Sequence, residues 1–161
     1  MNPLQIGTRG SPLAIWQAQY VGNRLRSLAG TRAVELIEIE TAGDQTRDKP
    51  LSQIGGEGLF TKEIQRALLD GRCDVAVHSL KDLPTLPVAG LVLAAVPQRG
   101  PAADVFISPR HSSFDQLPLQ AVVATSSLRR RAQILHRRRD LQLIDIRGNV
   151  ETRLRKLTEQ K

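Results

Sequence analysis

The sequence predicts an α/β protein made of two successive lobes. Short segments rich in Val, Ile and Leu alternate with amphipathic helical segments along the chain, which is typical of sheets covered by helices. Two prolines and a glycine punctuate residues 97–101, and the charge balance changes at that point. Residues 1–97 carry 10 Lys and Arg against 10 Asp and Glu, whereas residues 98–161 carry 13 against 6. We therefore predict one domain over 1–97 and a second over 98–161.

Composition narrows the class of protein. Hydrophobic residues make up 40% of the 161 residues but aromatic residues only 3%, so a globular fold with an aliphatic core is expected. A single cysteine excludes an intrachain disulfide, the first residues lack a secretory signal, and no apolar run approaches the roughly 20 residues that span a bilayer. A cytoplasmic protein is the expectation. The net charge of +7 indicates an anionic partner, although a solvated basic surface would give the same count.

The first lobe begins with a clear strand, helix and strand. Leu4–Thr8 reads as a strand, and Ser11 followed by Pro12 is a typical helix start. The helix keeps one face apolar at spacings of three and four residues, and the residues of that face are Ala14, Ala18, Val21, Leu25 and Leu28. Ala33–Ile39 reads as the second strand.

A polar, glycine-rich stretch over Thr41–Gly58 then predicts a long loop, either a functional lid or an ordinary surface loop. After it, the spacing predicts a helix from Phe60 to Leu68, a turn at Asp70-Gly71, a buried strand over Val75–Ser79 and another strand over Leu91–Val96. In the second lobe an apolar segment at Asp104–Ile107 comes first. The remaining expected elements are a strand at Ala121–Thr125, a helix from Ser126 to about His136, a strand at Leu141–Ile146 and a helix from Asn149.

Polar residues recur where the predicted strands end. Helix N-termini offer free backbone N–H groups and a positive dipole end to anions, and the polar side chains there are Ser11, Ser126, Ser127 and Asn149. Arginine binds a carboxylate through two parallel hydrogen bonds, so a carboxylate pocket is predicted from Arg9, Arg129, Arg130, Arg147 and Arg153. The spacing alone favours a scatter of surface arginines over such a pocket. Arg131 and Arg137–Arg139 are expected to project into solvent.

Five ordered motifs resemble one enzyme family, porphobilinogen deaminase (hydroxymethylbilane synthase). The motifs are Thr8-Arg9-Gly10-Ser11-Pro12-Leu13-Ala14, Gly58-Leu59-Phe60-Thr61-Lys62-Glu63, Ala76-Val77-His78-Ser79-Leu80-Lys81-Asp82-Leu83-Pro84, Thr125-Ser126-Ser127-Leu128-Arg129-Arg130-Arg131 and Arg147-Gly148-Asn149-Val150-Glu151-Thr152-Arg153. The resemblance implies a transferase of tetrapyrrole (haem) biosynthesis that joins four porphobilinogens into linear hydroxymethylbilane. It also implies a periplasmic-binding-protein-like, two-lobed fold with helix-covered mixed sheets, here truncated and without the family's C-terminal third domain.

The resemblance also implies roles for individual residues. Asp82 would be the catalytic carboxylate, assisting proton transfer and stabilising the cation left when porphobilinogen loses ammonia; from base rates alone it would be a helix cap or turn residue. The residues implied to bind acetate and propionate groups of the cofactor and substrate are Arg9, Ser11, Lys81, Thr125, Ser126, Ser127, Arg129, Arg130, Arg147, Gly148 and Arg153. Phe60 would stack on a pyrrole ring or begin the core of its helix. His78 reads as a structural histidine, and no metal site is expected.

The chain departs from the family pattern in three respects. The family's dipyrromethane cofactor is attached by a thioether to a cysteine of the third domain, whereas Cys73 reads as a small buried residue. The family's chains are nearly twice as long, so we expect the 161 residues alone to be inactive. The resemblance also implies that a full-length protein is a monomer. Gln53 and Glu57 stand where many relatives have lysine.

Two other functions fit parts of the pattern. A stand-alone two-lobed anion-binding module would share the fold without catalysis, but it would gain nothing from Asp82 placed among arginines. A basic nucleic-acid-binding protein would explain the charge, but the chain has no recognisable nucleic-acid motif and almost no aromatic residues for stacking. The resemblance therefore favours porphobilinogen as the partner, with neither nucleic acid nor membrane.

Overall fold

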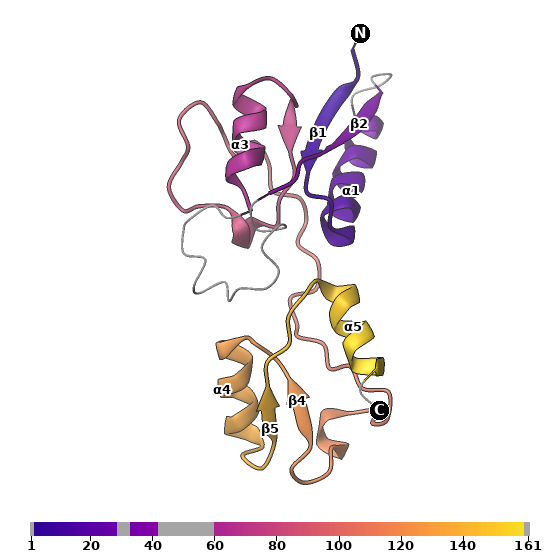
Figure 1. Cartoon of the computed structure of the whole chain (residues 1–161). Helices are drawn as coiled ribbons and strands as arrows, with labels where there is room; N and C mark the ends of the chain where they lie inside the picture. The colour runs from indigo at the N-terminus through magenta and orange to yellow at the C-terminus, as the bar shows by residue number, and fades with distance from the viewer. Residues whose placement is uncertain (1, 29–32, 42–59, 160–161) are drawn as a thin grey trace. The chain divides into compact units, whose positions relative to one another are not determined.

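The computed structural model describes residues 2–28, 33–41 and 60–159. The chain divides into two compact units, Met1–Gln98 and Arg99–Lys161, which are described separately (Figure 1). The sequence placed the division after residue 97. The predicted loop over Thr41–Gly58, with Gln53 and Glu57, lies outside the described residues except for its first position.

Unit 1 contains a three-stranded parallel sheet. Its strands are β1 (Leu4–Thr8), β2 (Val34–Glu38) and β3 (Val75–Ala76), in the order β2-β1-β3. In register, Ile6 lies opposite Leu36 on one side and Val75 on the other. The first two predicted strands are confirmed, but the third is shorter than predicted because the chain leaves the sheet after Val77, whose N–H donates to the Gly7 carbonyl at 3.1 Å.

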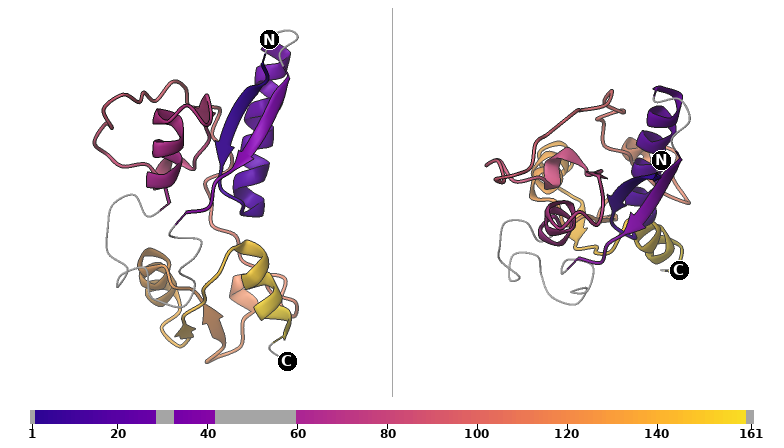
Figure 2. Two further views of the ribbon diagram at one scale, coloured as in Figure 1. Left: turned by 45° about the horizontal axis from the view of Figure 1, so that its top comes forward. Right: turned by 90° about the horizontal axis from the view of Figure 1, so that it is seen from above.

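Helices α1 (Pro12–Leu28) and α3 (Lys62–Leu69) cover opposite faces of this sheet (Figure 2). On the α1 face, a Cβ added at the buried Gly22 would lie 3.2 Å from Val34 and 3.5 Å from Ile6, so glycine permits this close helix-to-sheet packing. On the α3 face, Ile64 and Ala67 are fully buried. The core therefore lies on both sides of β1.

The core on the α3 face depends on small residues at the sheet. Ile39, Ile64, Ala67 and Cys73 form one buried cluster. A Cβ at Gly7 would lie 2.7 Å from the Cys73 sulfur, so this strand position accepts only glycine without a shift of its neighbours. The expectation that Cys73 is a small buried residue is confirmed, and burial raises the pKa of its thiol.

The helix boundaries follow the sequence signals. The Ser11 carbonyl accepts the Ile15 N–H at 2.9 Å and its hydroxyl accepts the Ala14 N–H at 3.3 Å, so Ser11 caps α1 as predicted. Helix α3 ends at Leu69, and Gly71, two residues later, has φ 68°. The N–H of Gly71 donates to Leu68 and that of Arg72 to Ala67, the Schellman arrangement that glycine favours.

The prediction of a strand over Leu91–Val96 was wrong. No strand is formed there, and Val92 is 86% exposed and Val96 62% exposed. A strand needs a hydrogen-bonded neighbour, and among the described residues none pairs with this segment. An apolar run by itself does not supply that neighbour.

Unit 2 repeats the alternation on a smaller scale. Strands β4 (Val122–Ala124) and β5 (Gln142–Ile144) pair in parallel, each followed by a helix, α4 (Leu128–Arg137) and α5 (Val150–Glu159). The predicted strands and helices of this lobe are confirmed with shorter bounds. Every strand pair in the described part of the chain is parallel, so the antiparallel component of the expected mixed sheets does not occur there.

The apolar segment Asp104–Ile107 forms no regular element. Val105 is 80% exposed, whereas Phe106 packs its ring edge-to-face on Phe114 at a centroid distance of 5.8 Å. Phe114 belongs to a short 3-10 helix, η2 (Phe114–Gln116). This aromatic pair fixes the segment that carries Asp104.

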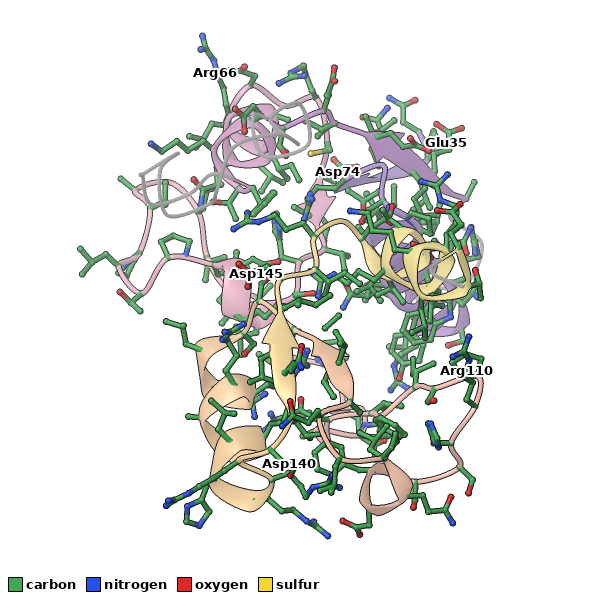
Figure 3. The ribbon with its side chains drawn as sticks, turned by 60° about the horizontal axis from the view of Figure 1, so that its bottom comes forward. Glu35, Arg66, Asp74, Arg110, Asp140 and Asp145 are labelled. Atoms are coloured by element: carbon green, nitrogen blue, oxygen red, sulfur yellow. The ribbon has the colours of Figure 1, made fainter. Side chains whose placement is uncertain are left out.

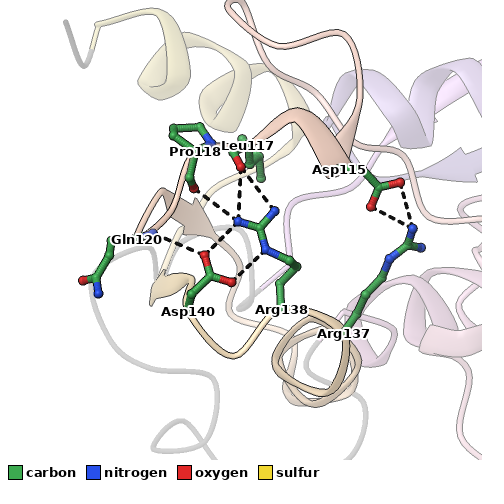
Figure 4. A network of polar contacts seen from close by, with 7 residues as sticks. All are labelled: Asp115, Leu117, Pro118, Gln120, Arg137, Arg138 and Asp140. Carbon is green, nitrogen blue, oxygen red and sulfur yellow. Dashed lines mark hydrogen bonds and ion pairs between the residues drawn. The ribbon is translucent and has the colours of Figure 1, made fainter.

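The expectation that Arg138 projects into solvent was wrong (Figure 4). Its Nε and Nη2 donate to the two oxygens of Asp140 at 2.7 Å each, and its guanidinium also donates to the Leu117 and Pro118 carbonyls. The side chain is only 20% exposed. Arg138 therefore ties the end of α4 to the turn before β4, and it holds the pKa of Asp140 down to about 2. Arg137 is exposed as expected and pairs with Asp115.

Candidate functional site

The site residues of unit 1 lie at one edge of its sheet. Because β1 and β3 are parallel neighbours, the residues that follow them emerge side by side. Arg9 comes directly after β1, and the segment from His78 to Asp82 follows β3. The predicted group of strand-end residues is thus brought together within unit 1.

Arg9 is held over an aromatic ring. Its guanidinium carbon lies 4.2 Å from the centroid of the Phe60 ring, a cation–π contact that orients the planar guanidinium. Phe60 immediately precedes the first turn of α3 and is partly buried. The sequence offered two roles for Phe60, stacking on a pyrrole or beginning the helix core. The structure shows a different contact, between the Phe60 ring and Arg9.

Asp82 ends a single 3-10 turn, η1 (Leu80–Asp82), whose last N–H donates to the Ser79 carbonyl at 2.9 Å. The turn is anchored to α1, because the Ser79 hydroxyl lies 3.1 Å from the side-chain amide nitrogen of Gln17. Asp82 is partly buried and Lys81 is exposed. The sequence did not single out Gln17, whose position on α1, 62 residues from Ser79, carries no local signal.

The pKa of His78 is changed by burial and by two neighbouring charges. Burial lowers its pKa; the charge of Asp82 opposes this and that of Arg9 reinforces it. A lowered pKa keeps the imidazole neutral at pH 7. Asp82 and Arg9 therefore both lie within electrostatic range of His78.

The hydroxyl residues of unit 2 mostly build the framework of their site. The Ser126 hydroxyl donates to the Ile146 carbonyl at 2.9 Å and accepts the Ile146 N–H at 3.0 Å, which joins the ends of β4 and β5. Thr125 is 7% exposed and its hydroxyl accepts the Ser127 N–H. Ser127 caps α4 by accepting the Arg130 N–H, so the helix begins after Ser127 and not at Ser126 as predicted.

Arg129 and Arg130 share one carboxylate, that of Asp104. Nη1 and Nη2 of Arg129 donate to the two Asp104 oxygens at 2.9 and 3.0 Å. Nε and Nη2 of Arg130 approach the Oδ1 atom at 3.0 and 2.9 Å. The two arginines hold the pKa of Asp104 down to about 2. Sequence reasoning missed Asp104, since the partners are 25 and 26 residues apart.

Arg131 does not project into solvent, contrary to expectation. It donates to the Thr125 carbonyl at 3.4 Å and lies 3.5 Å from Asp145. Figure 3 shows Asp145 just after β5, at the opposite end of that strand from Asp140. Arg131 therefore strengthens the connection between the ends of the two strands that Ser126 begins.

The remaining candidates surround the start of α5. Gly148 has φ 113°, a backbone conformation that residues with a side chain rarely adopt. Its carbonyl accepts the Arg153 Nε–H at 2.8 Å. Asn149 caps α5 by accepting the Thr152 N–H. Arg147 is exposed, and among the described residues its guanidinium has no hydrogen bond or ion pair. Arg147, Gly148 and Arg153 thus lie on one short stretch at the carboxyl end of β5.

Neither a metal-binding cluster nor a membrane-spanning helix is found in the described residues. No three His, Cys, Asp or Glu side chains gather there as a metal-binding group. In the same part of the chain, none of the helices combines the length and the apolar character needed to cross a membrane.

The fold and site define an α/β protein whose parallel strands end in arginines and hydroxyls suited to an anionic ligand. The family model described as "Porphobilinogen deaminase, dipyromethane cofactor binding domain" matches residues 4–161. The chain belongs to the porphobilinogen deaminase family.

Curated relatives agree with that assignment. The porphobilinogen deaminase of Syntrophotalea carbinolica is 51% identical over 159 residues, covering 99% of this chain and 50% of the relative. That of Syntrophomonas wolfei is 52% identical, covering 99% and 52%, and that of Geobacter sulfurreducens is 51% identical, covering 100% and 50%. The chain therefore spans about half the length of these relatives.

Proposed function

We propose that this chain supplies the cofactor- and substrate-binding half of a hydroxymethylbilane synthase. The complete enzyme condenses four porphobilinogens, with loss of ammonia, into linear hydroxymethylbilane. The two units correspond in this proposal to parts of the two lobes of a periplasmic-binding-protein-like fold. Parallel sheets whose strands alternate with helices support the assignment, because ligands of such folds bind at the carboxyl ends of strands.

The chemistry of the donor set fits the dipyrromethane cofactor, which carries acetate and propionate groups. Arg129 and Arg130 already bind a carboxylate in this structure, that of Asp104. When bound, the cofactor supplies the primer to which pyrroles are added. The residues proposed to hold its acidic groups and those of the substrate are Arg9, Ser11, Lys81, Thr125, Ser126, Ser127, Arg129, Arg130, Arg147, Gly148 and Arg153.

Cys73 does not fit the role of cofactor attachment. It is 4% exposed and lies against Gly7 in the core, and burial raises the pKa of its thiol, which disfavours the reactive thiolate. We propose that attachment requires a cysteine outside these 161 residues.

Asp82 is the proposed catalytic group. Its carboxylate can accept hydrogen bonds from pyrrole N–H groups, stabilise positive charge that develops on the substrate as ammonia leaves, and carry a proton. His78, kept neutral by burial, is proposed to support the position of Asp82 and not to act as the base. The observation that supports this proposal is the parallel pairing of β1 and β3, because Arg9 follows β1 and the turn that ends at Asp82 follows β3 at the same edge of the sheet.

A chimera tests the proposal. This chain would replace the matched half of the Syntrophotalea carbinolica enzyme, and consumption of porphobilinogen would be measured. We expect turnover by the chimera and a fall in kcat of at least about 100-fold in its Asp82→Asn variant, the usual contribution of a general acid or base. Asp70→Asn, at an exposed carboxylate after α3, is the matched control and should leave kcat unchanged.

The opposite outcomes are equally clear. If Asp82→Asn retained full turnover, the catalytic role would be rejected. If the variant bound polycarboxylates more tightly and no chimera turned over porphobilinogen, the chain would be an anion-binding module. The purified 161-residue chain is expected to consume no porphobilinogen, and measurable consumption by it would contradict the proposal that it supplies only half of the enzyme.

A further inference from the structure

Asp104 occupies a different edge of each arginine that it binds. A guanidinium has an end edge, formed by Nη1 and Nη2, and a side edge, formed by Nε and Nη2, and each edge can bind one carboxylate through two N–H groups. Asp104 takes the end edge of Arg129 and the side edge of Arg130. The side edge of Arg129 and the end edge of Arg130 therefore remain available for other carboxylates.

Both arginine side chains are partly exposed. The side chain of Arg129 is 59% exposed and that of Arg130 is 43% exposed. In the described part of the chain neither guanidinium has a side-chain partner other than Asp104. Each arginine is thus partly exposed and keeps one pair of N–H donors that no side chain of the described residues occupies.

Asp104 also offsets unfavourable charge at this point. Arg129 and Arg130 lie in the first turn of α4, where the positive end of the helix dipole repels cations. Two neighbouring guanidiniums would repel one another as well. A carboxylate bridging both holds them in place, and bidentate pairs in a network are the surface ion pairs that persist.

The position of Asp104 is itself restrained. It precedes Phe106 by two residues, and Phe106 packs on Phe114. The bridge therefore joins the restrained segment 104–106 to the capped start of α4, where Ser127 accepts the Arg130 N–H. Both sides of the bridge are fixed to the framework of unit 2.

We propose that Asp104 is a positioning residue that orients Arg129 and Arg130 so that one two-donor edge of each receives a ligand carboxylate. The ligand chemistry that fits is a dicarboxylate, such as the acetate and propionate groups of one pyrrole. The inference deepens the proposed function and rests on it for the identity of the ligand. Asp104 would not touch the ligand; it acts through the two arginines.

The competing possibility is that Asp104 blocks the site. In that case its removal would free both arginines and strengthen anion binding. Under the positioning proposal its removal weakens binding, because two long side chains must then be immobilised by the ligand itself. The two possibilities predict changes of opposite sign.

The test measures binding of glutarate, a simple dicarboxylate, to the 161-residue chain and its Asp104→Asn variant by NMR titration. At about 0.15 M salt, where distant charges are screened, we expect glutarate affinity to fall at least about fivefold, the order of effect of freeing one or two long side chains. The Nε–H signal of Arg130 should exchange with water faster in the variant. Equal or tighter binding would overturn the proposal.

Asp115→Asn is the matched control. It removes the same charge from unit 2 and frees Arg137, which pairs with Asp115 at 2.7 Å, outside the proposed site. Glutarate affinity should change less than twofold. Removing a negative charge should by itself favour anion binding, so a loss equal to that of Asp104→Asn would show that the loss is not specific to the Asp104 bridge and would reject the inference.

Two further variants separate this inference from the proposed function. Asp104→Glu keeps the charge and should restore part of the affinity. If the Asp104→Asn protein were unfolded, its NMR spectrum would lose amide dispersion. The test would then use Asp104→Glu, for which a smaller loss of affinity is expected. Arg129→Gln should abolish glutarate binding if the anion site exists. Loss with Arg129→Gln but no loss with either Asp104 variant rejects the positioning role alone; no loss with Arg129→Gln rejects the anion site itself.

Discussion

Unit 1 and unit 2 share an order of strands and helices but are stabilised differently. Unit 1 has fully buried apolar residues on both faces of β1, among them Ile6, Ala18 and Ile64. In the described residues of unit 2 only Leu141 and Thr125 are buried, and neither α4 nor α5 has a buried residue. The comparison teaches that unit 1 is organised by apolar packing and unit 2 by polar contacts at the ends of its strands.

The largest expected effect is at the centre of the unit 1 core. Ile64→Ala removes a fully buried side chain and should lower the free energy of unfolding by about 3 kcal/mol, the middle of the usual range for such truncations. Chemical denaturation followed by circular dichroism would measure this. A loss below about 1 kcal/mol would contradict the view that apolar packing organises unit 1.

Gly7→Ala should have the next largest effect. The new Cβ would meet the Cys73 sulfur at 2.7 Å, so the strand or the core must shift, at a cost of about 2 kcal/mol. Combining it with Cys73→Ala should recover part of the loss, because the smaller side chain removes the closest contact. If the double variant were no more stable than Gly7→Ala alone, that contact would not be the cause.

For unit 2, Arg138→Ala should reduce thermal stability more than Arg137→Ala. Arg138 binds Asp140 and two backbone carbonyls (Figure 4), whereas the exposed Arg137 pairs, within the described residues, with Asp115 alone. Amide hydrogen exchange in β4 and β5 would locate the effect. Equal losses from the two variants would show that net charge, and not this network, stabilises the unit.

The smallest expected effect is one of pH. The pKa values of Asp104 and Asp140 are lowered from 3.8 to about 2 by their arginine partners. Their stabilisation is therefore fully present above about pH 4 and is lost as the pH falls through about 2. An NMR titration should show a small loss of unit 2 stability in that window, and Asp140→Asn should remove part of the dependence.

Local signals in the sequence predicted much of this fold. Ser11 with Pro12, and Asp70 with Gly71, mark helix ends that depend on the residues immediately beside them, and both are confirmed. The failure at Leu91–Val96 has a different origin, because strand formation depends on a partner that sequence periodicity does not reveal. Element type was predictable where the cause is local.

The candidate site shows the same limit. The positions of Arg9 and Asp82 at neighbouring strand ends followed from the alternation of strands and helices. The burial of Arg138, the pairing of Arg131 with Asp145 and the bridge through Asp104 all join residues through tertiary contacts, with Asp104 25 residues from Arg129. Runs of arginine look alike in a sequence, and only the fold distinguishes Arg138, which binds backbone carbonyls, from Arg129 and Arg130, which share the Asp104 carboxylate.

The hydroxyl of Ser126 has a mechanical consequence. It both donates to and accepts from the backbone of Ile146, and these two hydrogen bonds extend the pairing beyond the last paired residues of β4 and β5. The start of α4 and the turn that leads to α5 must then shift together. In the proposed site, a ligand bound by arginines of one segment would therefore keep its position relative to the other segment.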